Sequence, residues 1–287
     1  MTEAGFALEE LLIARMAKEY RGGRMGVGAT ILADLSARLA KALYVPDLFL
    51  TTISRAAADP QIHAKTFSDE WALDESATMA LGWEEMFRLI AHQKLQIWIG
   101  SVQIDRFGGS NISVIGDWER PRAQLIGARG IPDDLWGCET LNYHIRKHTP
   151  KSFVEKVDFV CGFGKSPDLG SVGVQPAAPG VVISDLGVFD FNGADGAMRV
   201  VSLHPGVDFA KVQEMTGFEL ADPGPDVPVT EAPTAEELHI IRNVIDPSGM
   251  RRLESNEATP ALFNELWARE LQNSKAGADA SRKAASC

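Results

Sequence analysis

Apolar residues recur along this chain first at helical and then at strand spacing, and this alternation constrains the fold more than any other feature. Helical periodicity marks residues 8–16, 32–43 and 83–90, whereas residues 48–53 and 95–99 are short and β-prone. Helices that alternate with short buried strands are typical of an α/β sheet. The length of 287 residues is enough for a substantial hydrophobic core.

Several further segments have the composition of strands. A turn at Asn192–Gly193, between the predicted strands 181–191 and 198–203, indicates that part of the sheet is antiparallel. The sequence therefore predicts an α/β sheet with an antiparallel portion. The further predicted strands are residues 112–115, 123–126, 157–161, 181–191 and 198–203.

Capping signals locate the helices of the C-terminal third. A helix is predicted from Asp208 to about residue 217, and Thr234 with Glu237 forms a capping box for the next one. The character of the sequence changes near residue 250. We therefore expect one main domain over 1–250 and a C-terminal extension over 251–287, with a short helix and a frayed end.

Charge and composition exclude several classes of protein. The 28 basic and 39 acidic side chains give a net charge of −11, which opposes binding to nucleic acid. The sequence contains no apolar stretch long enough to span a membrane and no secretion signal, so we expect a cytoplasmic protein. Its cysteines, Cys138, Cys161 and Cys287, are widely spaced and are expected to stay reduced, the first two as core thiols.

Two local patterns have both a functional and a structural interpretation. The glycines around Gly26 and Gly28 could hold a phosphate, but a tight strand-to-helix turn capped by Thr30 fits better because the third glycine of a dinucleotide fingerprint is missing. His144 and His148 have helical spacing for a metal, yet Arg146 lies between them and would repel a cation. A solvated helix face is the favoured prediction, and no metal site is expected.

The stretch from Gly100 to residue 134 is more informative. It contains a glycine-rich turn around Gly108 and a second one at 127–130, each close behind β-prone residues. Open α/β sheets place ligands at such turns, whose N–H groups can stabilise a thioester or enolate oxygen. Two ordinary tight turns remain the simpler interpretation of the pattern alone.

These residues carry a resemblance to a known family. The segment GSVQIDRFGGSN at 100–111, then SFVEKVDFVCGFG at 152–164 and VVISDLGVFDF at 181–191, resembles the β subunits of family I coenzyme A transferases of the glutaconate type. The resemblance covers roughly residues 8–250. It implies an open, mostly parallel sheet with helices on both faces, a separate α subunit in an αβ or α2β2 assembly, and an acyl-coenzyme A substrate with no other cofactor.

Two departures from the family pattern bear on the chemistry. Where these transferases carry a nucleophilic glutamate, the aligned triplet here is Ile53-Ser54-Arg55, and isoleucine cannot form a glutamyl thioester. The family's Gly-x-Gly-Gly turn reads Gly127-Ala128-Arg129-Gly130. Both departures resemble one branch of the family, the β subunits of two-subunit hydrolases that open the last ring in steroid degradation by hydration and retro-Claisen cleavage of a cyclic acyl-coenzyme A.

The resemblance also suggests roles for individual residues. Gly127 and Gly130 are expected to donate backbone hydrogen bonds to an oxyanion, and Arg129 or Arg55 to bind a substrate carboxylate or ring oxygen. The main base is expected on the partner subunit. The remaining candidate substrate-binding residues are Gln103, Asp105 and Asn111, of which Asp105 and Asn111 could equally brace the turns.

Two other hypotheses stay open on the sequence alone. The chain could belong to a true transferase whose nucleophile has moved, for example to Glu70 or Glu75. It could also be a non-catalytic scaffold for an active α subunit, because it contains no identifiable acid, base or nucleophile.

Overall fold

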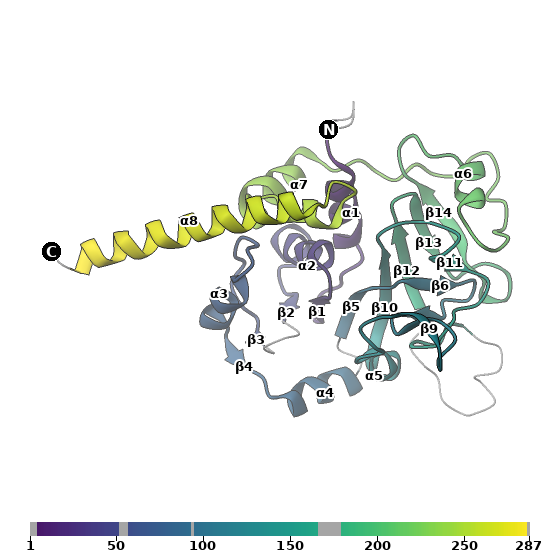
Figure 1. The fold of residues 1–287 in the computed structure, drawn as a ribbon, viewed down its shortest axis with the longest axis horizontal. Coiled ribbons are helices and arrows are strands. Elements are labelled where there is room, and N and C mark those ends of the chain that lie inside the picture. The colour runs from purple at the N-terminus through teal and green to yellow at the C-terminus, as the bar shows by residue number, and fades with distance from the viewer. Residues whose placement is uncertain (1–4, 52–56, 93–94, 166–178, 286–287) are drawn as a thin grey trace.

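A seven-stranded sheet forms the centre of the molecule (Figure 1). The computed structural model describes residues 5–51, 57–92, 95–165 and 179–285. The strand order is β14-β13-β12-β10-β5-β1-β2, parallel from β12 to β2 and antiparallel across β12, β13 and β14. This confirms the predicted α/β sheet. The strands are β1 (Met25–Gly28), β2 (Phe49–Leu50), β5 (Leu95–Gly100), β10 (Cys138–Ile145), β12 (Pro179–Ser184), β13 (Gly187–Asp190) and β14 (Arg199–Leu203).

Two hydrophobic cores cover the two faces of the sheet. On one face α1 (Leu8–Ala17) and α2 (Ile31–Leu43) pack on Trp98 and Ile183. On the other, Val27, Ile97 and Tyr143 meet residues of α4 (Trp83–Ala91) and α5 (Ile131–Gly137). β2, β5, β12, β13 and β14 supply apolar side chains to both cores, whereas β1 and β10 supply them only to the second.

The turn from β1 to α2 is determined locally by its sequence. The Thr30 hydroxyl accepts a hydrogen bond from the Ala33 N–H at 3.2 Å, which caps α2. A Cβ atom at Gly28 would lie 2.2 Å from the Asp34 nitrogen, so only glycine lets the helix approach the strand this closely. The predicted strand-to-helix turn is confirmed.

Short strands outside the main sheet lie between β5 and β10 and shortly after β10 in the chain. β6 (Gln103–Asp105), β7 (Ser110–Asn111) and β11 (Phe153–Val154) form one small sheet. β8 (Val114–Gly116) and β9 (Pro121–Gln124) form a hairpin that leads through residues 125–130 into α5. On the other side of the main sheet, β3 (Ala57–Ala58), α3 (Asp69–Ser76) and β4 (Met79–Ala80) lie between β2 and α4.

In the C-terminal third, the predicted helix caps are confirmed, but the last helix is longer than predicted. Asp208 caps α6 (Phe209–Glu214), and the capping box of Thr234 and Glu237 begins α7 (Ala235–Ile240). A π-helical turn, η3 (Ile241–Ile245), and a 3-10 turn, η4 (Met250–Glu254), follow; another 3-10 turn, η2 (Ala194–Gly196), lies between β13 and β14. The last helix, α8 (Pro260–Ala285), has 26 residues and projects from the body, so it is longer than the short helix expected there (Figure 1).

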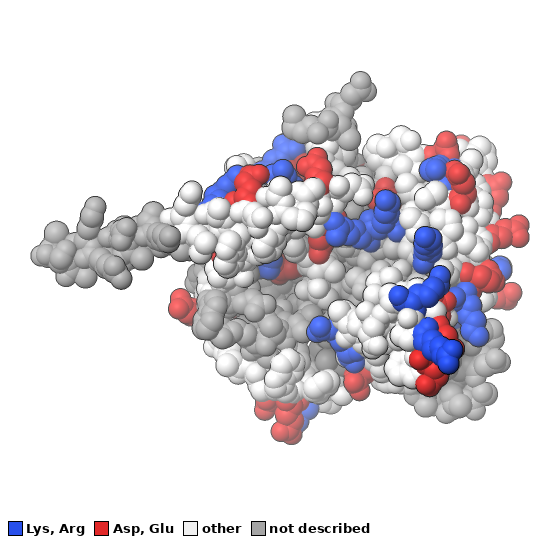
Figure 2. All heavy atoms as spheres, viewed as in Figure 1, with Lys and Arg blue, Asp and Glu red and all other residues white. Residues whose placement is uncertain are grey.

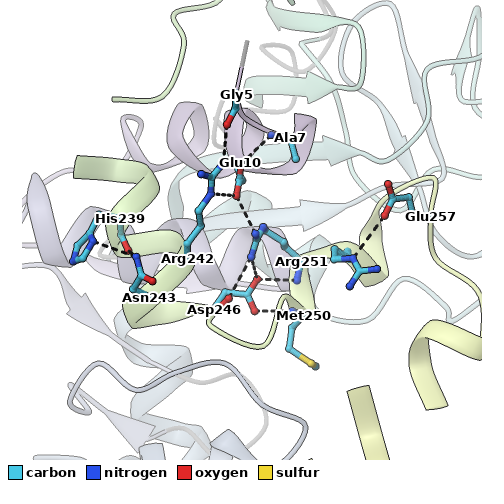
Figure 3. A network of polar contacts seen from close by, with 11 residues as sticks. Gly5, Ala7, Glu10, His239, Arg242, Asn243, Asp246, Met250, Arg251 and Glu257 are labelled. Atoms are coloured by element: carbon cyan, nitrogen blue, oxygen red, sulfur yellow. Dashed lines mark hydrogen bonds and ion pairs between the residues drawn. The ribbon is translucent and has the colours of Figure 1, made fainter. Parts of the chain in front are cut away.

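A buried ion network attaches this C-terminal segment to α1 (Figure 3). Glu10 accepts hydrogen bonds from Arg242 at 2.8 and 2.7 Å and from Arg251 at 2.9 Å, and Arg251 also donates to Asp246 at 2.8 Å. Burial opposes ionisation of Glu10, but the two guanidinium groups and the Ala7 N–H outweigh it and lower the pKa of this carboxyl. The network therefore fixes η3 and η4 against the first helix.

Four strand predictions were wrong or displaced. Residues 157–161 form no strand, and Phe153–Val154 pairs with β6 instead. Residues 181–191 form two antiparallel strands rather than one, because the chain turns at Asp185–Leu186. The predicted strands at 112–115 and 123–126 are displaced slightly, to β8 and β9. Among the described residues, no helix is long and apolar enough to cross a membrane.

Candidate functional site

The loop at 127–130 has an unusual backbone. Gly127 has φ +84°, and Arg129 has φ +51°, in the left-handed region that residues with a Cβ rarely adopt. Within the described residues, the N–H groups of residues 127–130 donate to no other group, while the Gly130 carbonyl accepts from Asp133 and Asp134 at 3.0 and 2.9 Å. The loop thus presents unsatisfied N–H donors next to the first turn of α5.

The Arg129 side chain extends from this loop into solvent. It is exposed and makes no hydrogen bond or ion pair with any described residue. Left-handed backbone at a residue with a Cβ costs on the order of 1 kcal/mol, and such strain is concentrated at functional sites. The guanidinium is therefore available to bind an anionic or carbonyl oxygen brought to the loop.

The candidates Gln103 and Asn111 bond to each other. The Asn111 Nδ2 donates to Gln103 Oε1 and to the Val114 carbonyl, both at 2.7 Å, and its Oδ1 accepts from the Ser113 N–H at 2.9 Å. Gln103 Oε1 also accepts from the Asp158 N–H at 3.1 Å. Both side chains are buried and their hydrogen-bonding groups join β6, β7 and β8, so they hold these strands together.

Asp105 closes the first glycine-rich turn. Its Oδ1 accepts from the N–H groups of Phe107 at 3.0 Å and Gly109 at 2.8 Å. Burial raises the pKa of Asp105, although these N–H groups act in the opposite direction. The geometry is that of an Asx-type turn brace, and the carboxylate faces its own loop.

The sequence analysis did not single out Asp134, which lies in α5 one turn after Gly130. The side chain is 8% exposed, and burial, with a smaller contribution from the Asp133 charge, raises the pKa of its carboxyl to about 7. A carboxyl with a pKa near neutrality beside free N–H groups is characteristic of a reactive site. Asp134 becomes a candidate only because its side chain is buried, and the sequence of two consecutive aspartates does not show which of them is buried.

Part of the predicted site lies outside the described residues. The triplet Ile53-Ser54-Arg55 falls in the range 52–56, which the structure does not describe, so the position of Arg55 stays a prediction. The same holds for the side chain of Glu70, whereas Glu75 is exposed in α3.

The glycine turn before α2 is already occupied by the protein's own carboxylate. Glu254 from η4 accepts hydrogen bonds from the N–H groups of Ile31 at 2.9 Å and Leu32 at 3.0 Å. With Thr30 on Ala33, these contacts use the N–H groups that would otherwise bind phosphate. The turn therefore has a structural role.

The prediction that His144 and His148 lie on a solvated helix face was wrong. His144 belongs to β10, and both side chains are buried. His148 stacks on Phe153, and its ring nitrogens bond to Ser184 and Thr216, both at 2.9 Å. Burial lowers the pKa of His148 to about 3, so the ring is neutral at physiological pH.

The two described cysteines are core thiols, as predicted. Cys138 is 1% exposed and Cys161 is 4% exposed, and both are free. Burial raises the pKa of both thiols, which disfavours the nucleophilic thiolate.

The surface near the loop is partly apolar. Large side chains remain exposed on the hairpin, the loop, α5 and the segment after β11: Trp118, Ile126, Trp136, Val160 and Phe163. On the face in Figure 2, Lys and Arg form a broken row flanked by Asp and Glu. Exposed apolar groups of this kind are typical of a surface that contacts another protein, and the cations give anionic groups a local attraction despite the negative net charge.

Comparison with known proteins defines the class of this fold. No protein-family model matches the sequence. The glutaconate coenzyme A-transferase of Acidaminococcus fermentans has a similar structure, with a TM-score of 0.77 at 23% identity, over 86% of this chain and 97% of that chain. The chain therefore has the fold of a coenzyme A transferase subunit, an open, mostly parallel sheet with helices.

The sequence relatives define the family more narrowly. The chain is 36% identical over 237 residues to the cholesterol ring-cleaving hydrolase IpdB subunit of Mycobacterium tuberculosis, covering 78% of this chain and 88% of the relative. The crystal structure of Rhodococcus jostii IpdAB matches with a TM-score of 0.76 at 32% identity, over 88% of this chain and 99% of that chain. The chain belongs to the family of IpdB subunits, which confirms the resemblance found in the sequence.

Proposed function

We propose that this chain is the β subunit of a coenzyme A thioester-dependent hydrolase that opens the last ring in steroid degradation. The observation that carries the proposal is the loop at 127–130, where the strained Arg129 places an unpaired guanidinium beside free N–H donors. The relatives' name, a cholesterol ring-cleaving hydrolase subunit, gives the substrate class. The proposed substrate is a carboxyethyl-methyl-oxocyclohexene-carboxyl-coenzyme A.

The proposed reaction is compatible with the residues of the loop. Water adds to the ring enone, and a hydroxide equivalent then attacks the ring carbonyl in a retro-Claisen step. The ring carbon–carbon bond breaks, and its electron pair becomes a thioester enolate that is later protonated. Gly127 and Gly130 would donate N–H hydrogen bonds to the developing oxyanion, and Arg129, or Arg55, would bind the carboxylate arm or ring oxygen.

This chemistry needs no acyl-enzyme intermediate. Isoleucine at position 53, where the family's transferases have a nucleophilic glutamate, is therefore acceptable and suppresses transfer to other acids. The coenzyme A would be part of the substrate, and no further cofactor would be required. Within this proposal Gln103, Asp105 and Asn111 hold the turns in place.

An α subunit would complete the enzyme. The crystal structure of the Rhodococcus jostii relative is that of IpdAB, and the exposed apolar side chains beside the loop suit burial against such a partner. The main base would come from that subunit, in an αβ or α2β2 assembly.

Mass spectrometry of the reaction tests the proposal. The chain is co-expressed with its α partner and given the cyclic oxo-ene coenzyme A thioester in ¹⁸O-labelled water with acetate present. We expect a ring-opened product that gains labelled oxygen and keeps its coenzyme A. Acetyl-coenzyme A together with the free ring acid would overturn the proposal and indicate a transferase. An Arg129→Ala complex with unchanged kcat/KM would favour a scaffold role for this chain.

A further inference from the structure

Asp134 differs from the other buried carboxyl groups of the described chain. Glu10, Glu237 and Asp246 are each at most 1% exposed, and they accept hydrogen bonds from arginine, tyrosine or backbone N–H groups. Asp134 is 8% exposed, and its carboxyl makes no hydrogen bond or ion pair with any described residue. The carboxyl oxygens of Asp134 keep some contact with solvent, so this group is neither paired within the protein nor sealed in the core, and its position beside the loop suits contact with a ligand.

The geometry of α5 directs this carboxyl back towards the loop. Helical side chains tilt towards the N-terminus of their helix, and the Asp134 N–H bonds to the Gly130 carbonyl one turn earlier at 2.9 Å. A Cβ atom built on Gly130 would lie 3.6 Å from Asp134 Oδ2 and 3.8 Å from Oδ1. The carboxyl therefore lies against Gly130, where the absence of a side chain leaves it accessible from the loop.

The surroundings favour the protonated form of Asp134. Its nearest titratable neighbour on the same helix is Asp133, an anion, and burial raises the pKa of Asp134 to about 7. On β10, burial raises the pKa of Cys138 and of Tyr143, so both stay neutral. The charged residues of α4, which packs on α5, are Glu85 and the ion-paired Glu84 and Arg88.

We propose that Asp134, in its neutral form, is a third hydrogen-bond donor of the oxyanion site, beside the N–H groups of Gly127 and Gly130. The inference rests on the proposed function and adds a catalytic residue that this chain itself supplies. The Asp134 O–H donates to the enolate or tetrahedral oxygen of the acyl-coenzyme A, and this hydrogen bond strengthens as negative charge develops there. No covalent bond to the enzyme forms, and the proton stays on Asp134.

Three variants of the two-subunit complex test this role through the pH dependence of ring opening. With the wild type, we expect kcat/KM to fall as the pH rises through about 7, because ionised Asp134 can no longer donate. Asp134→Ala should lower kcat about 100-fold at pH 6, the usual effect of losing one oxyanion donor. Asp134→Asn should recover at least tenfold of that loss and abolish the fall near pH 7, since an amide N–H donates at every pH.

Asp133→Asn is the matched control, because it removes an exposed carboxylate from the same helical turn. We expect it to keep the activity of the wild type at pH 6 and to keep the fall, moved to slightly lower pH because the Asp133 charge contributes to the raised pKa of Asp134. The inference is overturned if Asp134→Asn is as inactive as Asp134→Ala at pH 6, which would indicate a base. It is also overturned if Asp134→Ala stays within threefold of the wild type.

A second measurement separates this inference from the proposed function. Carbon-13 NMR of carboxyl-labelled aspartate in the complex should reveal one group that titrates near pH 7 in the wild type and at slightly lower pH in Asp133→Asn, and that is absent from Asp134→Asn. If the wild type fails to open the ring, the proposed function is wrong while this titration stands. If no such titration exists, the inference about Asp134 fails whatever the reaction is.

Discussion

Replacing Glu10 by alanine should weaken the attachment of the C-terminal segment to α1 (Figure 3). The change removes the hydrogen bonds from Arg242 and Arg251 at 2.7–2.9 Å. It leaves Arg242 with the Gly5 carbonyl and Arg251 with Asp246 as their remaining acceptors. Breaking a buried ion pair costs about 3–5 kcal/mol. The Arg242 side chain is 37% exposed and can be rehydrated, so we expect a loss at the lower end, about 3 kcal/mol. This corresponds to a fall in Tm of about 5 °C for a chain of 287 residues.

Urea denaturation and amide hydrogen exchange measure the two consequences of this change. Glu9→Ala, in the same helical turn, is the control and should alter the free energy of unfolding by less than about 0.5 kcal/mol. Exchange at the Ile31 and Leu32 N–H groups should accelerate in Glu10→Ala, because Glu254 caps them from η4. A loss below about 1 kcal/mol, or unchanged exchange at both amides, would refute the conclusion that the network fixes this segment.

The remaining predictions concern the loop, α5 and the β1–α2 turn. Arg129→Gly should raise the free energy of unfolding by about 1 kcal/mol, measured in urea, because it relieves the left-handed backbone, and should lower kcat/KM at least about 30-fold through loss of a charge-assisted contact. The pKa of Asp134 is raised from 3.8 in the unfolded chain to about 7, so its contribution to stability is complete below pH 4 and disappears as the pH rises through 7. At about 1.4 kcal/mol per unit of pKa shift, the free energy of unfolding should fall by about 4 kcal/mol as Asp134 ionises. Urea denaturation at different pH values should show this fall in the wild type but not in Asp134→Asn. Gly28→Ala should destabilise the chain by about 3 kcal/mol in thermal or urea unfolding, since its Cβ would collide with the Asp34 nitrogen; a change below about 1 kcal/mol would contradict the close packing of strand and helix.

Elements that depend on neighbouring residues could be predicted from the sequence. Thr30, Asp208 and Thr234 cap the helices expected of them, because a cap is formed by residues three positions apart. The loop at 127–130 could also be found, since its glycines and the substitution of Arg129 are visible as a motif. The family and its fold follow from such motifs.

Elements that depend on burial could not be predicted. β10 was missed because Asn142 and His144 interrupt its apolar residues, and only its position between β5 and β12 makes these polar side chains internal. Residues 157–161 look equally β-prone, yet they find no partner strand in the sheet.

The sequence by itself determined the helix caps, the glycine turns and the family of this protein, because each depends on residues close together in the chain. The tertiary structure alone decided which charges are buried and which are paired. Glu254 reaches α2 from 223 residues away, whereas Asp134, five residues beyond Arg129, lies buried without a partner. Such differences arise from long-range packing, which sets the desolvation of a carboxyl and therefore its pKa.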